Sequence, residues 1–272
     1  MSDAAVAERA PGPSWPADRR PLSVVVVGNS ITSIQLPVDG GPAGDVYAAV
    51  MADRLTAAGI PTRTALEGRW FDFAVRGRRQ YEQRVRSHLP DVVVVQYGLN
   101  EAQPWIVPVW LIRHLLRETW AVTRTARWYR RVIARRVWLG VRRLRRWASP
   151  KVGLRTWQTT PERFRGHLHA LVQGAQREMG ALVLVIDLND SGDRLEHFLP
   201  GQARRHAVFQ QVIEEVVEAC ATPMVRLVRS SEICRTIGPT ALPDGMHYSP
   251  EAHAAIGNVL ADEVIAYLRD AG

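Results

Sequence analysis

Four stretches of the chain consist almost entirely of aliphatic residues, the pattern typical of strands that are covered on both faces of a sheet. A weaker fifth stretch, TRTAL, follows a helix stop signal. Strands are therefore predicted at Leu22–Val27, Thr62–Leu66, Asp91–Tyr97, Ala181–Leu188 and Met224–Val228.

Polar segments with apolar residues at helical spacing separate these runs. Helices are predicted at Asp45–Ala58, Gly77–Leu89, residues 162–179, residues 202–221 and Pro250–Leu268. Strands that alternate with helices form βαβ units, in which the strands are parallel. The pattern predicts an α/β fold, a three-layer α/β/α sandwich with about five parallel strands. Ligands of such sheets bind at the carboxyl ends of the strands.

Positive charge is concentrated in one part of the chain. Between Pro104 and Trp157 there are fourteen Lys and Arg residues and one acid, Glu118, a local net charge of +13. The whole chain carries +8, so the remaining residues carry about −5. Seven of the nine tryptophans lie in the same segment. This segment therefore differs in kind from the rest of the domain.

Residues 104–159 have the features of a helical insertion. Ile106–Leu116 is one helix candidate, and a second has arginines between apolar residues at helical spacing. The apolar residues of the second helix are Trp128, Val132, Ile133, Val137, Val141 and Leu144. We expect a basic helical hairpin beside the carboxyl edge of the sheet, within a single domain of residues 22–272.

Three short motifs stand at the predicted strand ends or before the last helix. Gly28-Asn29-Ser30 follows the first strand, Gly98-Leu99-Asn100-Glu101 follows the third, and Asp244-Gly245-Met246-His247 precedes Pro250. A serine after a strand is more often a helix cap than a nucleophile. An acid and a histidine three residues apart, however, allow the carboxylate to bind the imidazole.

In this order the three motifs resemble those of the SGNH hydrolases, also called the GDSL esterase/lipase family. The resemblance runs from about Leu22 to Leu268 and implies a flavodoxin-like SGNH fold. It implies that Ser30 is the nucleophile, that His247 takes and returns its proton, and that Asp244 fixes the tautomer of His247. It also implies that the Ser30 backbone N–H and the Asn100 side-chain amide bind the oxyanion.

The loop after the second strand departs from the family pattern. The family places there a glycine whose N–H is a third oxyanion donor, and here the loop reads EGRWFDF, residues 67–73. Gly68 is the nearest candidate, although the spacing also permits the N–H of Phe71 or Asp72. The aromatic residues Trp70, Phe71 and Phe73 are explained equally well by an apolar acyl pocket and by burial in the core.

The resemblance implies a serine esterase that hydrolyses an O-acyl ester through an acyl-serine intermediate. Two alternatives remain open. An acyltransferase of the same fold would use an acyl donor such as an acyl carrier protein. A non-catalytic binding module would dock a membrane or an acidic partner through the Arg- and Trp-rich insertion.

The insertion itself has three interpretations. It is a lid if its apolar stripe packs on the domain while its arginines stay solvated. It docks on a membrane surface if the basic residues and tryptophans face an anionic interface. It docks an acidic protein partner if its charge steers association. Nucleic acid is not expected as a partner because no recognition motif is present.

The remaining features concern cofactors and compartment. No G-x-G-x-x-G or P-loop motif is present, and the calcium-like run from Asp187 to Asp193 lacks the glutamate of the twelfth position. We therefore expect neither cofactor nor metal. Residues 1–21 contain no apolar run of a signal peptide and are predicted to be a disordered leader. Two cysteines form no disulfide framework, so a cytoplasmic protein is expected.

Overall fold

The computed structural model describes residues 20–34, 44–115 and 123–271. Its centre is one parallel sheet of five strands in the order β2-β1-β3-β4-β5. The strands are β1 (Leu22–Gly28), β2 (Thr62–Gly68), β3 (Val92–Gln96), β4 (Leu182–Ile186) and β5 (Val225–Val228). The leader predicted at residues 1–21 lies outside the described residues, except for its last two.

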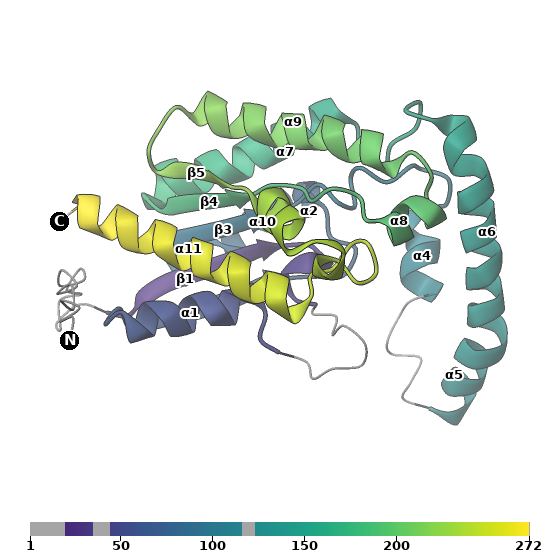
Figure 1. Ribbon diagram of the computed structural model, residues 1–272, viewed down its shortest axis with the longest axis horizontal. Coiled ribbons are helices and arrows are strands. Elements are labelled where there is room, and N and C mark those ends of the chain that lie inside the picture. Colours follow the sequence, from purple (N-terminus) through teal and green to yellow (C-terminus); the bar gives the residue numbers. More distant parts are fainter. Residues whose placement is uncertain (1–19, 35–43, 116–122, 272) are drawn as a thin grey trace, which may run out of the picture.

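Helices cover both faces of the sheet (Figure 1). One layer contains α1 (Tyr47–Ala57), α10 (Ser230–Ile237) and α11 (Pro250–Ala271). The other contains α2 (Ala74–Arg79), α7 (Pro161–Gln173) and α9 (Gln202–Cys220). The predicted three-layer α/β/α sandwich is confirmed. The strands β1, β3 and β4 are each buried along their full length, as expected for aliphatic runs covered on both faces.

The strand order is flavodoxin-like and creates a topological switch point. From β1 the chain passes to β2 on one side, and β3 then pairs with β1 on the other side. The connections from β1 and β3 therefore diverge, which leaves a crevice outside their carboxyl ends. Gly28-Asn29-Ser30 and the Gly98–Glu101 loop both lie at this crevice.

Two predicted features of the helices were wrong. The single helix expected at Gly77–Leu89 is three short pieces, namely α2, α3 (Tyr81–Arg84) and a 3-10 turn at Arg86–His88. Two helices were not predicted at all, α8 (Asp193–Phe198) and α10. The physical reasons are given in the Discussion.

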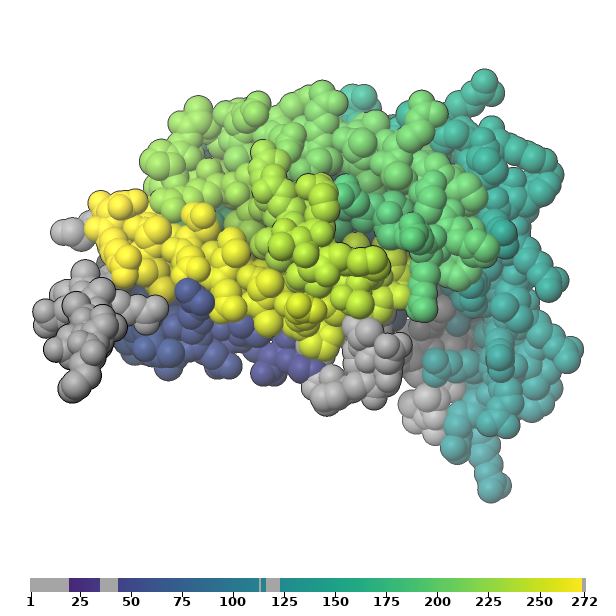
Figure 2. Space-filling view, in the orientation of Figure 1, coloured from purple at the N-terminus to yellow at the C-terminus, as the bar shows by residue number. Residues whose placement is uncertain are grey.

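The insertion stands beyond the carboxyl ends of the strands. It contains α4 (Val109–Leu115), α5 (Arg124–Tyr129), a π-helical stretch at Arg130–Ala134 and α6 (Arg135–Val152), the last three in one continuous helical run. Figure 1 shows this run along one end of the molecule, and Figure 2 shows that its surface adjoins that of α8 and α9. The described helices of the insertion lie beyond the carboxyl edge of the sheet, where a helical hairpin was expected.

A small second core joins the two arms of the insertion. Val107, Ile112 and Leu115 from the α4 region bury against Ala134 and Val141 of the long helix, and Phe71 of the loop after β2 packs on them. The C-terminal end of α6 contacts the domain, where the Ser149 hydroxyl donates to the Pro200 carbonyl at 2.9 Å.

Candidate active site

Ser30 lies at the start of a short 3-10 helix, Ser30–Thr32, directly after β1. Asn29 caps this helix, since its side-chain oxygen accepts the Ile31 N–H at 3.1 Å. Gly28 is needed one step earlier because a Cβ there would lie 2.5 Å from the Gln96 carbonyl oxygen of β3. The Gly-Asn-Ser sequence therefore lets β1 and β3 approach closely and holds the serine hydroxyl at the crevice.

His247 and Asp244 lie in the loop before α11, as predicted. Asp244 Oδ1 accepts the backbone N–H groups of Met246 at 2.8 Å and His247 at 2.7 Å. Its other oxygen, Oδ2, lies 2.7 Å from His247 Nδ1. The loop thus folds around the carboxylate, and the D-x-x-H spacing places acid and imidazole in direct contact.

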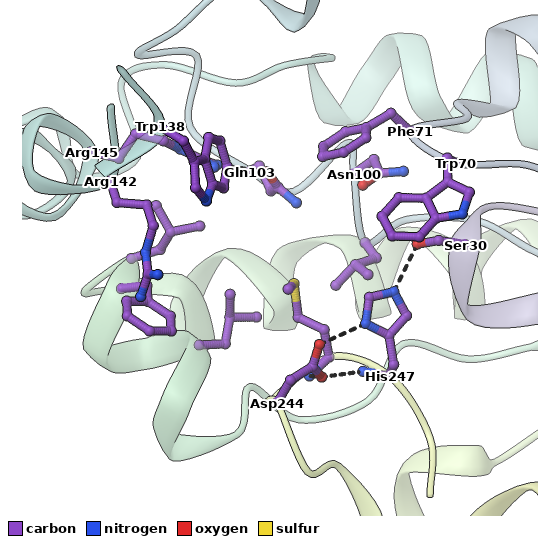
Figure 3. Close-up of a pocket in the computed structure, with 15 residues that line it drawn as sticks. Ser30, Trp70, Phe71, Asn100, Gln103, Trp138, Arg142, Arg145, Asp244 and His247 are labelled. Atoms are coloured by element: carbon purple, nitrogen blue, oxygen red, sulfur yellow. Dashed lines mark hydrogen bonds and ion pairs between the residues drawn. The ribbon is translucent and has the colours of Figure 1, made fainter. Parts of the chain in front are cut away.

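The contact with Asp244 fixes the position of one proton of the histidine. A carboxylate can only accept, so Nδ1 of His247 carries a proton, and Nε2 is the nitrogen that faces Ser30. The Nε2 atom lies 3.0 Å from the Ser30 hydroxyl oxygen. The three side chains form one continuous chain of hydrogen bonds, visible in Figure 3.

Asp244 is kept ionised by this arrangement. Burial alone would raise its pKa, but the hydrogen bond and positive charge of His247 and the two backbone N–H groups outweigh it. The pKa of Asp244 is therefore below its usual value. A carboxylate that stays charged can stabilise an imidazolium beside it.

Asn100 lies in the loop after β3 and lines the same cavity as Ser30. Its Nδ2 donates to the Asp72 carbonyl at 2.9 Å, which fixes the orientation of the amide. An amide nitrogen carries two hydrogens, so one donor is left for a ligand. The Asp72 carboxylate is anchored in turn by Arg84 at 2.5 Å and by the Tyr97 hydroxyl at 3.3 Å.

Glu101, which stands where the family has aspartate, has a structural position. It is completely buried, and its two oxygens accept the N–H groups of Ala74 at 2.6 Å and Gly98 at 3.1 Å. Burial raises the pKa of Glu101 to about 7 in spite of these hydrogen bonds. Glu101 joins the loop after β3 to the first residue of α2.

The loop after β2 lines the cavity with Phe71 and not with Gly68. Gly68 ends β2 against the helix of Ser30, where a Cβ would lie 1.8 Å from Thr32 Oγ1, and it does not line the cavity. Phe71 has a positive φ of 46° and does line the cavity. Trp70 also lines it, with its ring centroid 6.4 Å from that of His247, whereas Phe73 is buried. Two of the three aromatic residues thus belong to the pocket.

The cavity has a volume of about 250 Å³. Ser30 and His247 lie at one end of it, and Trp138, Arg142 and Arg145 of α6 lie at the other (Figure 3). Between them the lining is mainly apolar, with contributions from Leu99, Leu195, Phe198, Leu199 and Met246. A helix of the insertion is therefore one wall of the site.

Packing of the apolar stripe on the domain was one of the three interpretations of the insertion, and the structure does not support it. Val141 alone of the six residues of the stripe is buried, while Trp128, Ile133, Val137 and Leu144 are exposed. Arg145, by contrast, is buried and faces the cavity. Helical spacing alone could not distinguish these two faces because arginines and apolar residues occur on both.

His253, one helix turn beyond the site on α11, links three elements. Its Nδ1 accepts the Tyr47 N–H of α1 at 3.1 Å, and its Nε2 donates to the Ile34 carbonyl at 3.1 Å. Both hydrogen bonds require a neutral ring with the proton on Nε2. Burial accordingly lowers the pKa of His253 to about 4.

Neither a metal site nor a membrane span is found in the described part of the chain. No group of three or more His, Cys, Asp or Glu side chains there could hold a metal ion. No helix among residues 20–34, 44–115 and 123–271 is long and apolar enough to cross a membrane. The cellular compartment stays a prediction from sequence.

Comparison with known proteins establishes the class of fold. No family model and no curated protein matches the sequence. Solved structures do match, among them a lipase/acylhydrolase from Enterococcus faecalis with a TM-score of 0.60 and 16% identity, covering 90% of this chain and 96% of that one. A carbohydrate acetylesterase from Sinorhizobium meliloti matches with a TM-score of 0.57 and 17% identity, covering 90% of this chain and 99% of that one.

An acetylxylan esterase from Geobacillus stearothermophilus also matches, with a TM-score of 0.53 and 15% identity over 91% of this chain and 94% of that one. A GDSL-like lipase from Parabacteroides merdae is similar to the same degree. The fold implied by the SGNH resemblance is therefore confirmed: the chain has the α/β fold of esterases and GDSL-like lipases.

Proposed function

We propose that this protein is a serine ester hydrolase of the SGNH type, with Ser30, His247 and Asp244 as its catalytic residues. The observation that carries the proposal is the continuous hydrogen-bonded chain from the Ser30 hydroxyl through His247 to Asp244, at 3.0 and 2.7 Å, at the end of a cavity. The esterase and lipase folds of the structural neighbours support it.

The geometry accounts for each proton. As the Ser30 oxygen attacks the ester carbonyl, its proton passes to Nε2 of His247, and Asp244 stabilises the imidazolium. When the tetrahedral intermediate collapses, the same proton goes to the departing alcohol. A water molecule then gives a proton to Nε2 and its hydroxide attacks the acyl-serine, and the proton returns to Ser30 as the acid leaves.

The oxyanion of the intermediate requires donors already in place. The Ser30 N–H is one candidate, since the first N–H groups of a helix have no partner within it. The free hydrogen of the Asn100 amide is the second. Gly68, packed against Thr32, is poorly placed to be the third, and the cavity-lining Phe71 is the better candidate.

The first test replaces the nucleophile. Ser30→Ala should abolish release of 4-nitrophenol from short acyl esters and labelling by a fluorophosphonate probe. Ser33→Ala, a neighbouring hydroxyl that does not line the cavity, is the matched control and should retain both. Unchanged turnover in Ser30→Ala would exclude the mechanism, and absence of labelling in the folded wild type would favour a non-catalytic binding module.

Acyl transfer uses the same acyl-serine and differs only in the molecule that resolves it. The wall that α6 forms across the cavity supports this alternative because it restricts access of water. Product analysis with candidate alcohols present distinguishes the two reactions. Free acid as the only product means hydrolysis, and a new ester means transfer.

We also propose that the outward face of the long insertion helix binds an anionic membrane surface. Exposed apolar and basic side chains alternate on it, a combination that favours the lipid interface. They include Trp128, Val137, Leu139, Arg143, Leu144, Arg146 and Trp147. An acidic protein partner would pair with the arginines but would leave so many exposed apolar side chains without a function.

Vesicle flotation tests this surface. The wild type should float with vesicles of phosphatidylglycerol and not with phosphatidylcholine, and Trp147→Ala combined with Arg143→Gln should reduce the bound fraction about tenfold. Trp105→Ala, an exposed tryptophan outside this helix, is the control. No flotation with the anionic vesicles would contradict the proposal and leave an acidic protein as the alternative.

A further inference from the structure

Three arginines among the described residues are buried, and two of them, Arg145 and Arg205, form no ion pair. Arg84 forms an ion pair with Asp72, and Arg205 donates to the main-chain carbonyls of Thr156 and Gly153. Arg145 donates through Nη2 to Gln103 Oε1 at 2.7 Å, and its Nε is buried without a partner. No carboxylate of the described residues lies within ion-pair distance of Arg145.

Arg145 lines the cavity together with a second arginine. Arg142, one helix turn earlier on α6, stacks its guanidinium over the Phe198 ring at 4.0 Å from the centroid. Neither Arg142 nor Arg145 is among the ion pairs found in the described residues. In Figure 3 both lie at the end of the cavity opposite Ser30 and His247. Two positive charges therefore face a space with mainly apolar walls.

The cavity itself supplies no anion to compensate them. Asp244 is the one acid that lines it, and both of its oxygens are already bound to the His247 loop. Burial lowers the pKa of Arg145 to about 10, so the guanidinium is still charged at neutral pH. A buried charge without a counter-charge is unfavourable. A ligand anion would remove that cost and supply the missing partner of Nε.

Gln103 adds a further donor beside the two arginines. It lies three residues after Asn100 in the same loop and also lines the cavity. Because its Oε1 faces Arg145, its amide nitrogen is the group left to donate. The far end of the cavity thus presents donors and positive charge, which is the chemistry that binds a carboxylate, sulfate or phosphate.

We propose that the substrate is an ester with a second, anionic group, which Arg142, Arg145 and Gln103 bind at the end of the cavity away from Ser30. A short apolar segment joins this group to the ester and lies against Leu195, Phe198 and Met246. The inference rests on the proposed ester hydrolysis and adds the class of substrate. It assigns Arg142 and Arg145 to substrate specificity.

Matched ester pairs test it. The mono-4-nitrophenyl ester of glutarate carries a carboxylate on the acyl side, and 4-nitrophenyl pentanoate has the same chain length without charge. For the alcohol side, 4-acetoxybenzoate is compared with its neutral methyl ester. The wild type should prefer the anionic member of at least one pair by about tenfold or more in kcat/KM, as expected for a charged group with a buried partner.

The variants are matched in charge. Arg145→Gln and Arg142→Gln should each lower kcat/KM for the preferred anionic ester about tenfold or more, while the neutral ester changes less than about threefold. Arg135→Gln and Arg136→Gln remove the same charge from exposed positions of the same helix and should leave both substrates unchanged. Because Arg142 is only partly buried, its variant remains informative if Arg145→Gln does not fold.

Three outcomes would overturn the inference. They are a wild-type preference for both neutral esters, an equal loss on charged and neutral esters in Arg145→Gln, and a loss in Arg136→Gln as large as that in Arg145→Gln. If no ester is cleaved at all, ester hydrolysis fails. The anion site is then tested separately by calorimetry with Ser30→Ala protein and monomethyl glutarate against methyl pentanoate. Equal binding of the two ligands, or no binding of either, would also overturn the inference.

Discussion

At the scale of single residues, Asn100 shows how one side chain divides its two amide hydrogens between fold and reaction. One hydrogen holds the Asp72 carbonyl, at 2.9 Å, and thereby the loop after β2. The other is free to bind an oxyanion at Ser30. In the proposed mechanism the same amide therefore links the shape of the cavity to the stabilisation of the intermediate.

Asn100→Asp should lower kcat for 4-nitrophenyl acetate about 100-fold or more with little change in KM. A carboxylate removes the donor and places negative charge where the oxyanion develops. Steady-state kinetics, with the thermal midpoint measured on the same samples, checks this. A loss confined to KM, or a loss that follows the thermal midpoint alone, would contradict a role in the oxyanion site.

His253 should remain neutral well below its ordinary pKa. Folding lowers the pKa of His253 from 6.5 to about 4. Below about pH 6.5 the ring is therefore protonated in the unfolded state but still neutral in the folded state. Stability from this group is full above pH 6.5 and is lost as the pH falls towards 4. The shift corresponds to as much as about 3 kcal/mol.

Nitrogen-15 NMR at about pH 5 should therefore find His253 with its proton on Nε2 alone. His253→Gln, which can accept and donate at the same places without titrating, should flatten the fall in the urea unfolding midpoint between about pH 7 and pH 5. An imidazolium spectrum at pH 5 would show the ring to be charged and the assignment to be wrong.

The residues that the sequence made predictable are those whose chemistry depends on short spacing. Asp244 and His247 meet because they lie three positions apart in one loop, and Ser30 follows a strand whose end is clear from its valines. Arg145 was not predictable. Its inward direction is set by packing of α6 against α4 and α8, which the alternation of arginine and apolar residues does not encode.

At the scale of elements, the packing of α1 against α11 depends on one glycine. A Cβ at Gly257 would lie 2.7 Å from the Tyr47 carbonyl oxygen and 2.7 Å from Val50 Cβ. The two helices can approach this closely only where one of them has no side chain. Since α11 follows the His247 loop directly, this contact also fixes the position of the imidazole.

Gly257→Ala should lower the free energy of unfolding by about 1–3 kcal/mol because the helices must separate. Gly166→Ala, on an exposed position of α7 with no atom near its added Cβ, is the control and should stabilise by up to about 1 kcal/mol. Urea unfolding measures both. Equal effects of the two substitutions would mean that the close approach is unimportant.

The helices that were mispredicted are those controlled by distant residues. α10 has its N-terminus capped by Asp187, which accepts the Ser231 N–H at 3.0 Å and lies 44 residues earlier in the chain. The segment after Gly77 breaks at Gln80, while Arg84 turns inward to pair with Asp72. A buried ion pair of this kind overrides a local helical pattern, and the local sequence gives no sign of it.

At the scale of the whole molecule, the basic insertion and the candidate active site lie at the same end. The basic insertion stands at one end of the molecule (Figure 1), where its helix α6 lines the cavity, and the remaining residues carry a net negative charge. Such separation attracts anionic ligands towards the site from a distance. The fold class was predictable because buried strands and helices alternate clearly, and the strand order followed from the family resemblance.

Raising NaCl from about 50 mM to about 500 mM should lower kcat/KM for the anionic esters several-fold and leave the neutral esters nearly unchanged, since salt screens charges over roughly 10 Å or less. Stopped-flow or steady-state assays at each salt concentration measure this. A salt response of equal size for neutral esters would point to an effect on folding instead.

The long insertion helix has a consequence beyond either of its faces. One helix carries Arg142 and Arg145 on the side of the cavity and Leu144, Arg146 and Trp147 on the outside. A displacement imposed at one face must move the other. Binding at the two faces is therefore thermodynamically linked, and linkage is reciprocal. A ligand that binds the outer face and raises the affinity for the ester must itself bind more tightly when the ester is present.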